Sequence, residues 1–158
     1  METDQLRDFI ERFAGVLCDS GIPRMPSRVF VALLATDSGR LTSTELAELL
    51  DISPAAVSGA VRYLTQVSLV TRERDPGSRR DRYRVLDDVW HEALLRRDQM
   101  LVRWESGLAE GVALLGADSP AGARLNGSLT FFAFVRRELP TLLERWYEER
   151  AASADRPR

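Results

Sequence analysis

The chain lacks lysine altogether, and all 22 of its basic side chains are arginine. Because this bias runs through the whole sequence, we give it no functional meaning. Cysteine occurs once, at Cys18, which excludes an internal disulfide and fits a reducing cytosol. No apolar run approaches the roughly 20 residues that a bilayer span needs, and the charged start at 1–4 is unlike a secretion signal. We therefore expect a cytoplasmic protein without a membrane partner.

Groups that carry catalysis are also scarce. The one histidine, His91, lies beside Trp90 without a nucleophile or a second ligand nearby. Cys18 has no cation within one helical turn that would stabilise a thiolate, so we favour an inert thiol. Neither a metal-ligand spacing nor a glycine-rich phosphate loop occurs. We therefore expect a protein that is not an enzyme and has no cofactor.

Charge is distributed unevenly along the chain. With 44% hydrophobic and 29% charged residues, the composition is that of a soluble globular domain. The net charge of −2 speaks against nucleic-acid binding, but residues 69–84 contain six arginines and three acidic residues. This local excess of +3 leaves −5 elsewhere, and phosphate contact requires basic groups only on the docking face. A solvated hairpin is the alternative interpretation of such a run.

Helix signals divide the first half of the chain. Apolar periodicity predicts a helix over 4–19, and Pro26 favours the start of a second one. Thr42 and Glu45 form a capping-box pattern that predicts a helix over 43–50. Ser53 followed by Pro54 predicts another over about 54–67. Two capped helices joined by a short turn are typical of a helix-turn-helix.

The helix predicted over 54–67 has two unlike faces. One is apolar and is expected to pack on Leu46 and Leu49; it consists of Val57, Ala60, Val61 and Leu64. The other is small or polar, which would let the backbone enter a major groove about 12 Å wide; it consists of Ala55, Ala56, Ser58, Gly59 and Arg62. The helix N-terminus at Ser53 suits a phosphate.

A hairpin is predicted directly after this helix. Residues 68–74 and 82–86 have strand character, and Asp75-Pro76-Gly77-Ser78 is a strong turn sequence. Arg79 and Arg80 then lie near the hairpin tip, within reach of the DNA backbone or the minor groove. A helix followed at once by such a hairpin indicates a winged helix-turn-helix.

The stretch 41–86, LTSTELAELLDISPAAVSGAVRYLTQVSLVTRERDPGSRRDRYRVL, resembles the winged helix of the MarR family of bacterial regulators, in its actinobacterial variety. The resemblance implies an obligate homodimer, a palindromic duplex DNA operator and repression relieved by a small molecule. By position it implies DNA contacts from Ser53, Ala55, Ala56, Ser58, Gly59 and Arg62, and from Arg79, Arg80 and Arg82 of the wing. No motif identifies the effector.

The second half of the chain carries dimerisation patterns. Leucines recur every seven residues, beside Trp90 and Trp104, and predict one helix of about 28 residues with a coiled-coil-like stripe; they are Leu94, Leu101, Leu108 and Leu115. The last helix has an apolar stripe too wide for one partner, and Pro140 is expected to kink or split it. Packing within a monomer core is the alternative. Trp90 and Trp104 suit either an effector cavity or an interface.

Together these patterns predict a mainly α fold with a small β wing. We expect an N-terminal dimerisation helix over 1–22, a DNA-binding winged helix over 23–87, C-terminal dimerisation helices over 88–152 and a frayed tail over 153–158. The predicted partners are double-stranded DNA, a second copy of the chain and a small-molecule effector. The alternative is a winged helix that binds protein, which would have no need of Arg79 and Arg80 beside a small-residue helix face.

Overall fold

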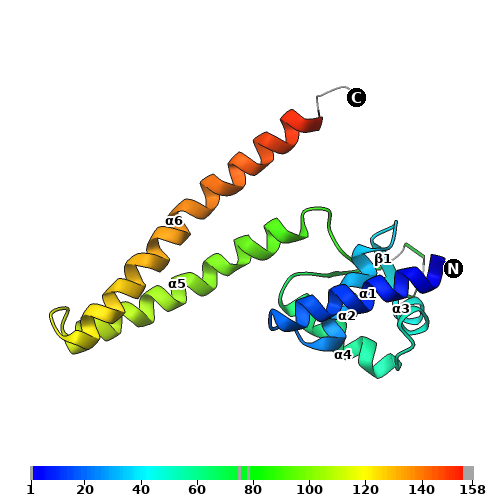
Figure 1. The fold of residues 1–158 in the computed structure, drawn as a ribbon, viewed down its shortest axis with the longest axis horizontal. Coiled ribbons are helices and arrows are strands. Elements are labelled where there is room, and N and C mark those ends of the chain that lie inside the picture. Colours follow the sequence, from blue (N-terminus) through cyan, green and yellow to red (C-terminus); the bar gives the residue numbers. More distant parts are fainter. Residues whose placement is uncertain (1, 75, 78, 155–158) are drawn as a thin grey trace. The chain divides into compact units, whose positions relative to one another are not determined.

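The computed structural model describes residues 2–74, 76, 77 and 79–154, with the backbone alone at 2, 3, 92 and 94–97. The chain forms two compact units, residues 1–93 and 94–158 (Figure 1). The first contains α1 (Glu2–Asp19), α2 (Arg24–Leu34), β1 (Arg40–Thr42), α3 (Ser43–Leu50), α4 (Pro54–Gln66), β2 (Thr71–Arg74) and β3 (Asp81–Arg84). The second contains most of α5 (Val89–Leu115) and α6 (Pro120–Ala154). This confirms a mainly α fold with a small sheet. Of the described helices, none combines the length and apolarity that crossing a bilayer takes.

The core of the first unit lies between four helices. Ile10 of α1 and Phe30 of α2 are fully buried, and α2 contributes more buried apolar side chains to this core than any other single helix. The apolar stripe of α4 packs here as predicted, with Val57, Ala60, Val61 and Leu64 all buried. Of the two expected partners on α3, Leu46 is buried in this core, and Leu49 is partly buried and packs against it; α3 also buries Leu50.

The predicted caps on α3 and α4 are confirmed. The backbone N–H of Thr42 donates to Glu45 Oε2 at 2.7 Å, and the Glu45 N–H donates back to Thr42 Oγ1 at 3.2 Å. Ser53 Oγ accepts from the Ala56 N–H at 3.1 Å, with Pro54 at the first helical position. Each short polar side chain therefore satisfies a backbone donor that the first helical turn leaves open.

A third strand joins the predicted hairpin. The sheet has the order β1-β3-β2 with both pairings antiparallel, and Thr42 lies opposite Arg82. We did not predict β1, because three residues are too short to show alternation, and only its pairing with β3 defines it. Both hairpin strands are shorter than the expected 68–74 and 82–86. Of the predicted turn, Asp75 and Ser78 lie outside the described residues.

The second unit is an antiparallel pair of helices (Figure 1). The long helix is confirmed as α5, with 27 residues. A Cβ at Gly122 would come within 1.8 Å of the Gly116 carbonyl oxygen, so the loop and α6 approach at a distance that requires glycine. Glu105 accepts two hydrogen bonds from Arg136, at 2.7 and 3.1 Å. Of the described heptad leucines, Leu101 is buried, Leu108 is half-buried and Leu115 is exposed; the side chain of Leu94 lies outside the description.

Of the two effects expected of Pro140, the split of the last helix is wrong, and the kink stays a prediction. α6 continues through Pro140 as one helix of 35 residues. Proline removes one backbone hydrogen-bond donor and crowds the carbonyl four residues earlier. The helical turns before and after it keep their backbone hydrogen bonds, so the helix continues. α6 also extends through residues 153 and 154, which we expected to belong to a frayed tail, and residues 155–158 lie outside the described part.

The capping box gives a first prediction. Thr42→Ala removes the hydroxyl that accepts from the Glu45 N–H, and we expect it to lower the free energy of unfolding by about 1 kcal/mol. Thr44→Ala, at an exposed position of the same helix, is the matched control and should change stability far less. Urea unfolding followed by circular dichroism measures both.

The same variant should respond to pH in a fixed direction. Hydrogen bonds from the backbone and side chain of Thr42 lower the pKa of Glu45 below its ordinary value. A carboxylate with a lowered folded-state pKa stabilises the fold above its unfolded-state pKa, and this contribution is lost as pH falls through the folded-state pKa. The stability difference between wild type and Thr42→Ala should therefore shrink in acid. A difference that is constant from neutral to acid pH would contradict this.

Candidate nucleic-acid interface

The predicted contact face of α4 is exposed in the structure. Ala55, Ser58, Gly59 and Arg62 are exposed and Ala56 is half-buried, opposite the stripe that the core covers. A Cβ at Gly59 would meet nothing within 4 Å. The exposed face of the first two turns of α4 thus carries only small side chains. One cation, Arg62, lies further along the same face. Such a surface permits close approach of the helix backbone to a groove.

Three arginines of the wing form ion pairs with acidic side chains of the same hairpin. Arg72 and Arg74 both form ion pairs with Asp81, and Arg84 pairs with Glu73 at 3.1 Å. The hydrogen bond from Arg72 lowers the pKa of Asp81, and the charges of Arg72 and Arg74 lower it further. These three arginines therefore neutralise the described acids of the hairpin, a use that we did not predict.

The three wing arginines that we did predict lie elsewhere on the hairpin. Arg79 and Arg80 are exposed near its tip, and Arg82 is half-buried on β3 beside Thr42. Besides the hydrogen bonds from Thr42, the charges of Arg82 and Arg80 lower the pKa of Glu45. The base of the wing thus faces the N-terminus of α3, and Arg82 has a structural role there in addition to any contact with a ligand.

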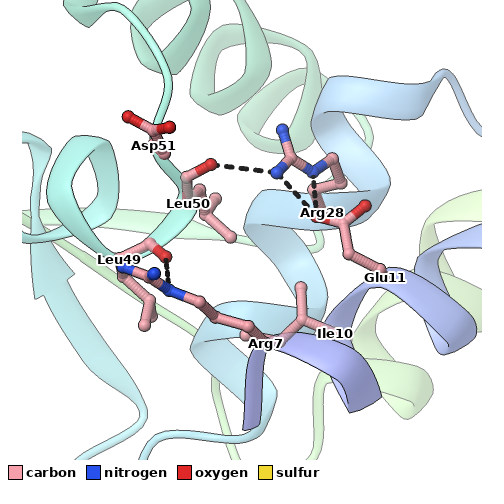
Figure 2. Close-up of a pocket in the computed structure, with 7 residues that line it drawn as sticks. All are labelled: Arg7, Ile10, Glu11, Arg28, Leu49, Leu50 and Asp51. Atoms are coloured by element: carbon pink, nitrogen blue, oxygen red, sulfur yellow. Dashed lines mark hydrogen bonds and ion pairs between the residues drawn. The ribbon is translucent and has the colours of Figure 1, made fainter. Parts of the chain in front are cut away.

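Sequence reasoning missed two further arginines near this surface. Arg7 of α1 donates to the Leu49 carbonyl at 3.0 Å, and Arg28 of α2 donates to the Leu50 carbonyl at 2.9 Å (Figure 2). Both carbonyls belong to the last turn of α3, immediately before the turn that leads into α4. The available signal was the end of α3 itself, which has Asp51 where a helix usually ends in glycine.

The remaining candidates fall in separate places. Trp90 packs edge-on against Phe30 at 5.4 Å in the first unit, where it also lines a cavity of about 300 Å³. Trp104 packs edge-on against Phe132 at 5.2 Å in the second unit. Cys18 is partly buried, with its thiol 3.7 Å from Ser27 Oγ. Within the described residues, no group of three or more His, Cys, Asp or Glu side chains could bind a metal ion.

Two family models match adjoining parts of the chain. A MarR family model matches residues 20–81, which include the helix-turn-helix and most of the wing. A model described as an MmpR5-like MarR family transcriptional regulator matches residues 88–149, which include α5 and most of α6. No curated protein matches the chain.

One solved structure has the same fold, and two others show a weaker likeness. One crystal structure of a transcriptional regulator is 23% identical, with a TM-score of 0.81 over 91% of this chain and 99% of its own. Sco3205, a MarR family regulator from Streptomyces coelicolor solved in complex with DNA, is 23% identical over 99% and 86%, with a TM-score of 0.42. Tm0710, a transcriptional regulator from Thermotoga maritima, is 20% identical over 92% and 93%, with a TM-score of 0.41. The last two likenesses are too weak to support an inference about this chain. From the two adjoining family matches and the shared winged-helix fold, the chain is a member of the MarR family.

Proposed function

We propose that this protein is a non-enzymatic transcriptional regulator that binds duplex DNA sequence-specifically as a homodimer. The observation that supports it most is the exposed small-residue face of α4 followed by an arginine-tipped hairpin. In a two-fold dimer, two such helices enter adjacent major grooves of one DNA face if they are about 34 Å apart. The operator is then an inverted repeat with half-site centres about 10 base pairs apart. Family membership favours repression in the cytoplasm.

Division of labour within the site follows from position. Ala55, Ala56 and Ser58 lie in the first two turns of α4, where base edges come nearest. Ser53 caps that end, so its neighbouring N–H groups and the helix dipole favour a phosphate. Arg62 lies further along the helix and positions the DNA backbone, as Arg79 and Arg80 do from the wing.

Homodimerisation is supported by exposed apolar surface. In the second unit Phe131 is 60% exposed and Leu142 is 56% exposed, and in the first unit Val16 of α1 is 57% exposed. α6 alone exposes Phe131, Phe134 and Leu142, and an exposed apolar patch on a soluble protein commonly marks an interaction site. We propose that α1, α5 and α6 form the dimer interface.

Response to a small molecule is also part of the proposal. Of the two tryptophans that we named from the sequence, Trp90 lines the cavity of about 300 Å³ in the first unit, together with Leu33, Val85 and Leu86. Asp37, Asp87 and Arg84 line the same cavity, so it suits a ligand that has both an apolar part and polar or charged groups. The role proposed for Trp104 rests on the sequence alone.

Dimerisation is tested by mass in solution. Multi-angle light scattering at micromolar concentration should give twice the chain mass of 17.8 kDa. Phe131→Glu should shift the equilibrium toward monomer, because it buries an unpaired carboxylate at an apolar contact. Asn126→Glu, at an exposed polar position of α6, is the control. A monomer mass for the wild type would contradict the proposal.

The wing is tested by salt dependence. Arg79→Ala combined with Arg80→Ala should weaken binding to all duplexes nearly alike. It should also flatten the slope of log K against log salt by about 0.9 for each lost phosphate contact in each subunit. Arg145→Ala with Arg150→Ala changes the net charge equally at exposed positions of α6 and should leave the slope unaltered. An unaltered slope in the wing variant would show that Arg79 and Arg80 do not contact DNA phosphates.

Base reading is tested on the exposed face of α4. Ala56→Glu places a carboxylate against phosphates and base acceptors in each half-site, and like charges in contact cost several kcal/mol. We expect affinity to fall more than about 100-fold. Ala56→Gln has the same size without the charge and is the matched control. Ala55→Glu repeats the test at an exposed position, in case the half-buried Ala56 does not accept a larger side chain.

Sequence selection from a random duplex library completes this test. An inverted repeat should emerge for the wild type, and Arg62→Ala should lower affinity while leaving the selected bases largely the same. A library that returns no inverted repeat, together with an active Ala55→Glu protein, would favour the alternative of a protein-binding winged helix.

A further inference from the structure

The last turn of α3 has an unusual set of hydrogen-bond donors. An α-helix leaves its last four carbonyls without partners inside the helix. In α3 the Ala47 carbonyl accepts from the backbone N–H groups of Asp51 and Ile52, the latter at 3.1 Å. The next three carbonyls, of residues 48–50, point toward α1 and α2. No basic residue lies in the last turn of α3 itself, so cations that favour this negative helix end must come from elsewhere.

Two arginines from other helices provide these donors. Arg7 of α1 donates from Nε to the Leu49 carbonyl at 3.0 Å and from Nη2 to the Glu48 carbonyl at 3.3 Å. Arg28 of α2 donates from Nη2 to the Leu50 carbonyl at 2.9 Å. All three remaining carbonyls are therefore satisfied by side chains that are distant in sequence, as Figure 2 shows for Leu49 and Leu50.

Arg28 is itself fixed by α1. Its Nε donates to Glu11 Oε1 at 2.6 Å, and its side chain is only 13% exposed. A guanidinium offers several donors in one rigid plane, so one side chain bridges a carboxylate of α1 and a carbonyl of α3. Arg7 and Glu11 lie one turn apart on α1, and both line a cavity of about 280 Å³ whose lining residues are drawn in Figure 2.

The turn after α3 transmits this constraint to α4. Only residues 51–53 separate the two helices, and Ser53 already caps α4 through the Ala56 N–H. Asp51 adopts a left-handed conformation, with φ of +49°, that a non-glycine residue adopts at a cost. Fixing the end of α3 therefore fixes where α4 begins.

We propose that Arg7 and Arg28 are positioning residues for DNA recognition, which orient the N-terminus of α4 by binding the C-terminal carbonyls of α3. The inference rests on the proposed DNA-binding function. Neither side chain belongs to the exposed face of α4 or to the wing, and so neither is assigned a contact with DNA. They affect affinity by fixing the turn at residues 51–53, which connects α3 to α4.

Arg7 gives the cleaner variant because its side chain is exposed and outside the apolar core. Arg7→Gln removes the guanidinium that binds Glu48 and Leu49. Arg12→Gln removes the same charge from an exposed position on the same helix and is the matched control. Arg7→Lys keeps the charge and one of the two donors, and we expect it to recover part of the loss.

The first measurement is amide hydrogen exchange by NMR, without DNA. In Arg7→Gln the amides of Asp51 and Ile52 should exchange at least about threefold faster, while those of Val61 and Leu64 in the middle of α4 stay unchanged. In Arg12→Gln all four should keep their wild-type rates. Unchanged exchange at Asp51 and Ile52 in Arg7→Gln would overturn the proposal whether or not the protein binds DNA.

The second measurement is affinity for the selected operator. Arg7→Gln should weaken binding about three- to tenfold with the same salt slope as the wild type, since no phosphate contact is lost. A slope that flattens by about 0.9 per subunit would identify Arg7 as a phosphate contact and overturn the positioning role. If the wild type binds no duplex, the proposed function fails by itself, and the exchange data still decide whether Arg7 constrains the turn.

Discussion

Burial of the apolar stripe of α4 is the constraint that determines the candidate DNA surface. Successive residues of a helix differ by about 100° in direction, so a stripe that faces the core fixes the direction of every other side chain. Because Val57 and Leu64 are buried in the same core as Phe30, Ser58 and Arg62 must face outward. A rotation of one residue would expose a buried valine or leucine, each worth about 1.5–3 kcal/mol. The core, and not the surface itself, therefore orients the small-residue face.

Fewer of the wing arginines face a possible DNA ligand than their number in the sequence suggests. Arg72, Arg74 and Arg84 form ion pairs with Asp81 and Glu73 within the hairpin. Exposed pairs of this kind contribute little to stability, but they link the two strands of the hairpin. Arg79 and Arg80 are exposed and lie toward the tip of the hairpin. A count of arginines along the sequence overestimates the cations that face a ligand.

Features that depend on neighbours in sequence could be predicted, and features that depend on distant partners could not. The cap from Thr42 to Glu45 and the buried face of α4 follow from spacing alone, so the sequence was sufficient for both. Strand β1 has three residues and exists only through β3, and periodicity has nothing to detect at that length. Proline usually interrupts a helix, but α6 continues through Pro140. Arg7 and Arg28 lie 42 and 22 residues from the carbonyls they bind, and only folding brings them together.

The helix ends at and near the turn between α3 and α4 find their hydrogen-bond partners in different parts of the sequence. The N-terminus of α3 is capped by Thr42 and that of α4 by Ser53, both adjacent in sequence. The C-terminus of α3 depends instead on α1 and α2. α1 also exposes Phe9 and Val16, which we propose face a second subunit. If so, a change in how the subunits pack alters the position of the helix that carries Arg7. A ligand shifts the equilibrium between two dimer geometries only if it binds one of them more tightly. The hydrogen bonds from Arg7 and Arg28 to the end of α3 would then carry a change in dimer geometry to the position of α4.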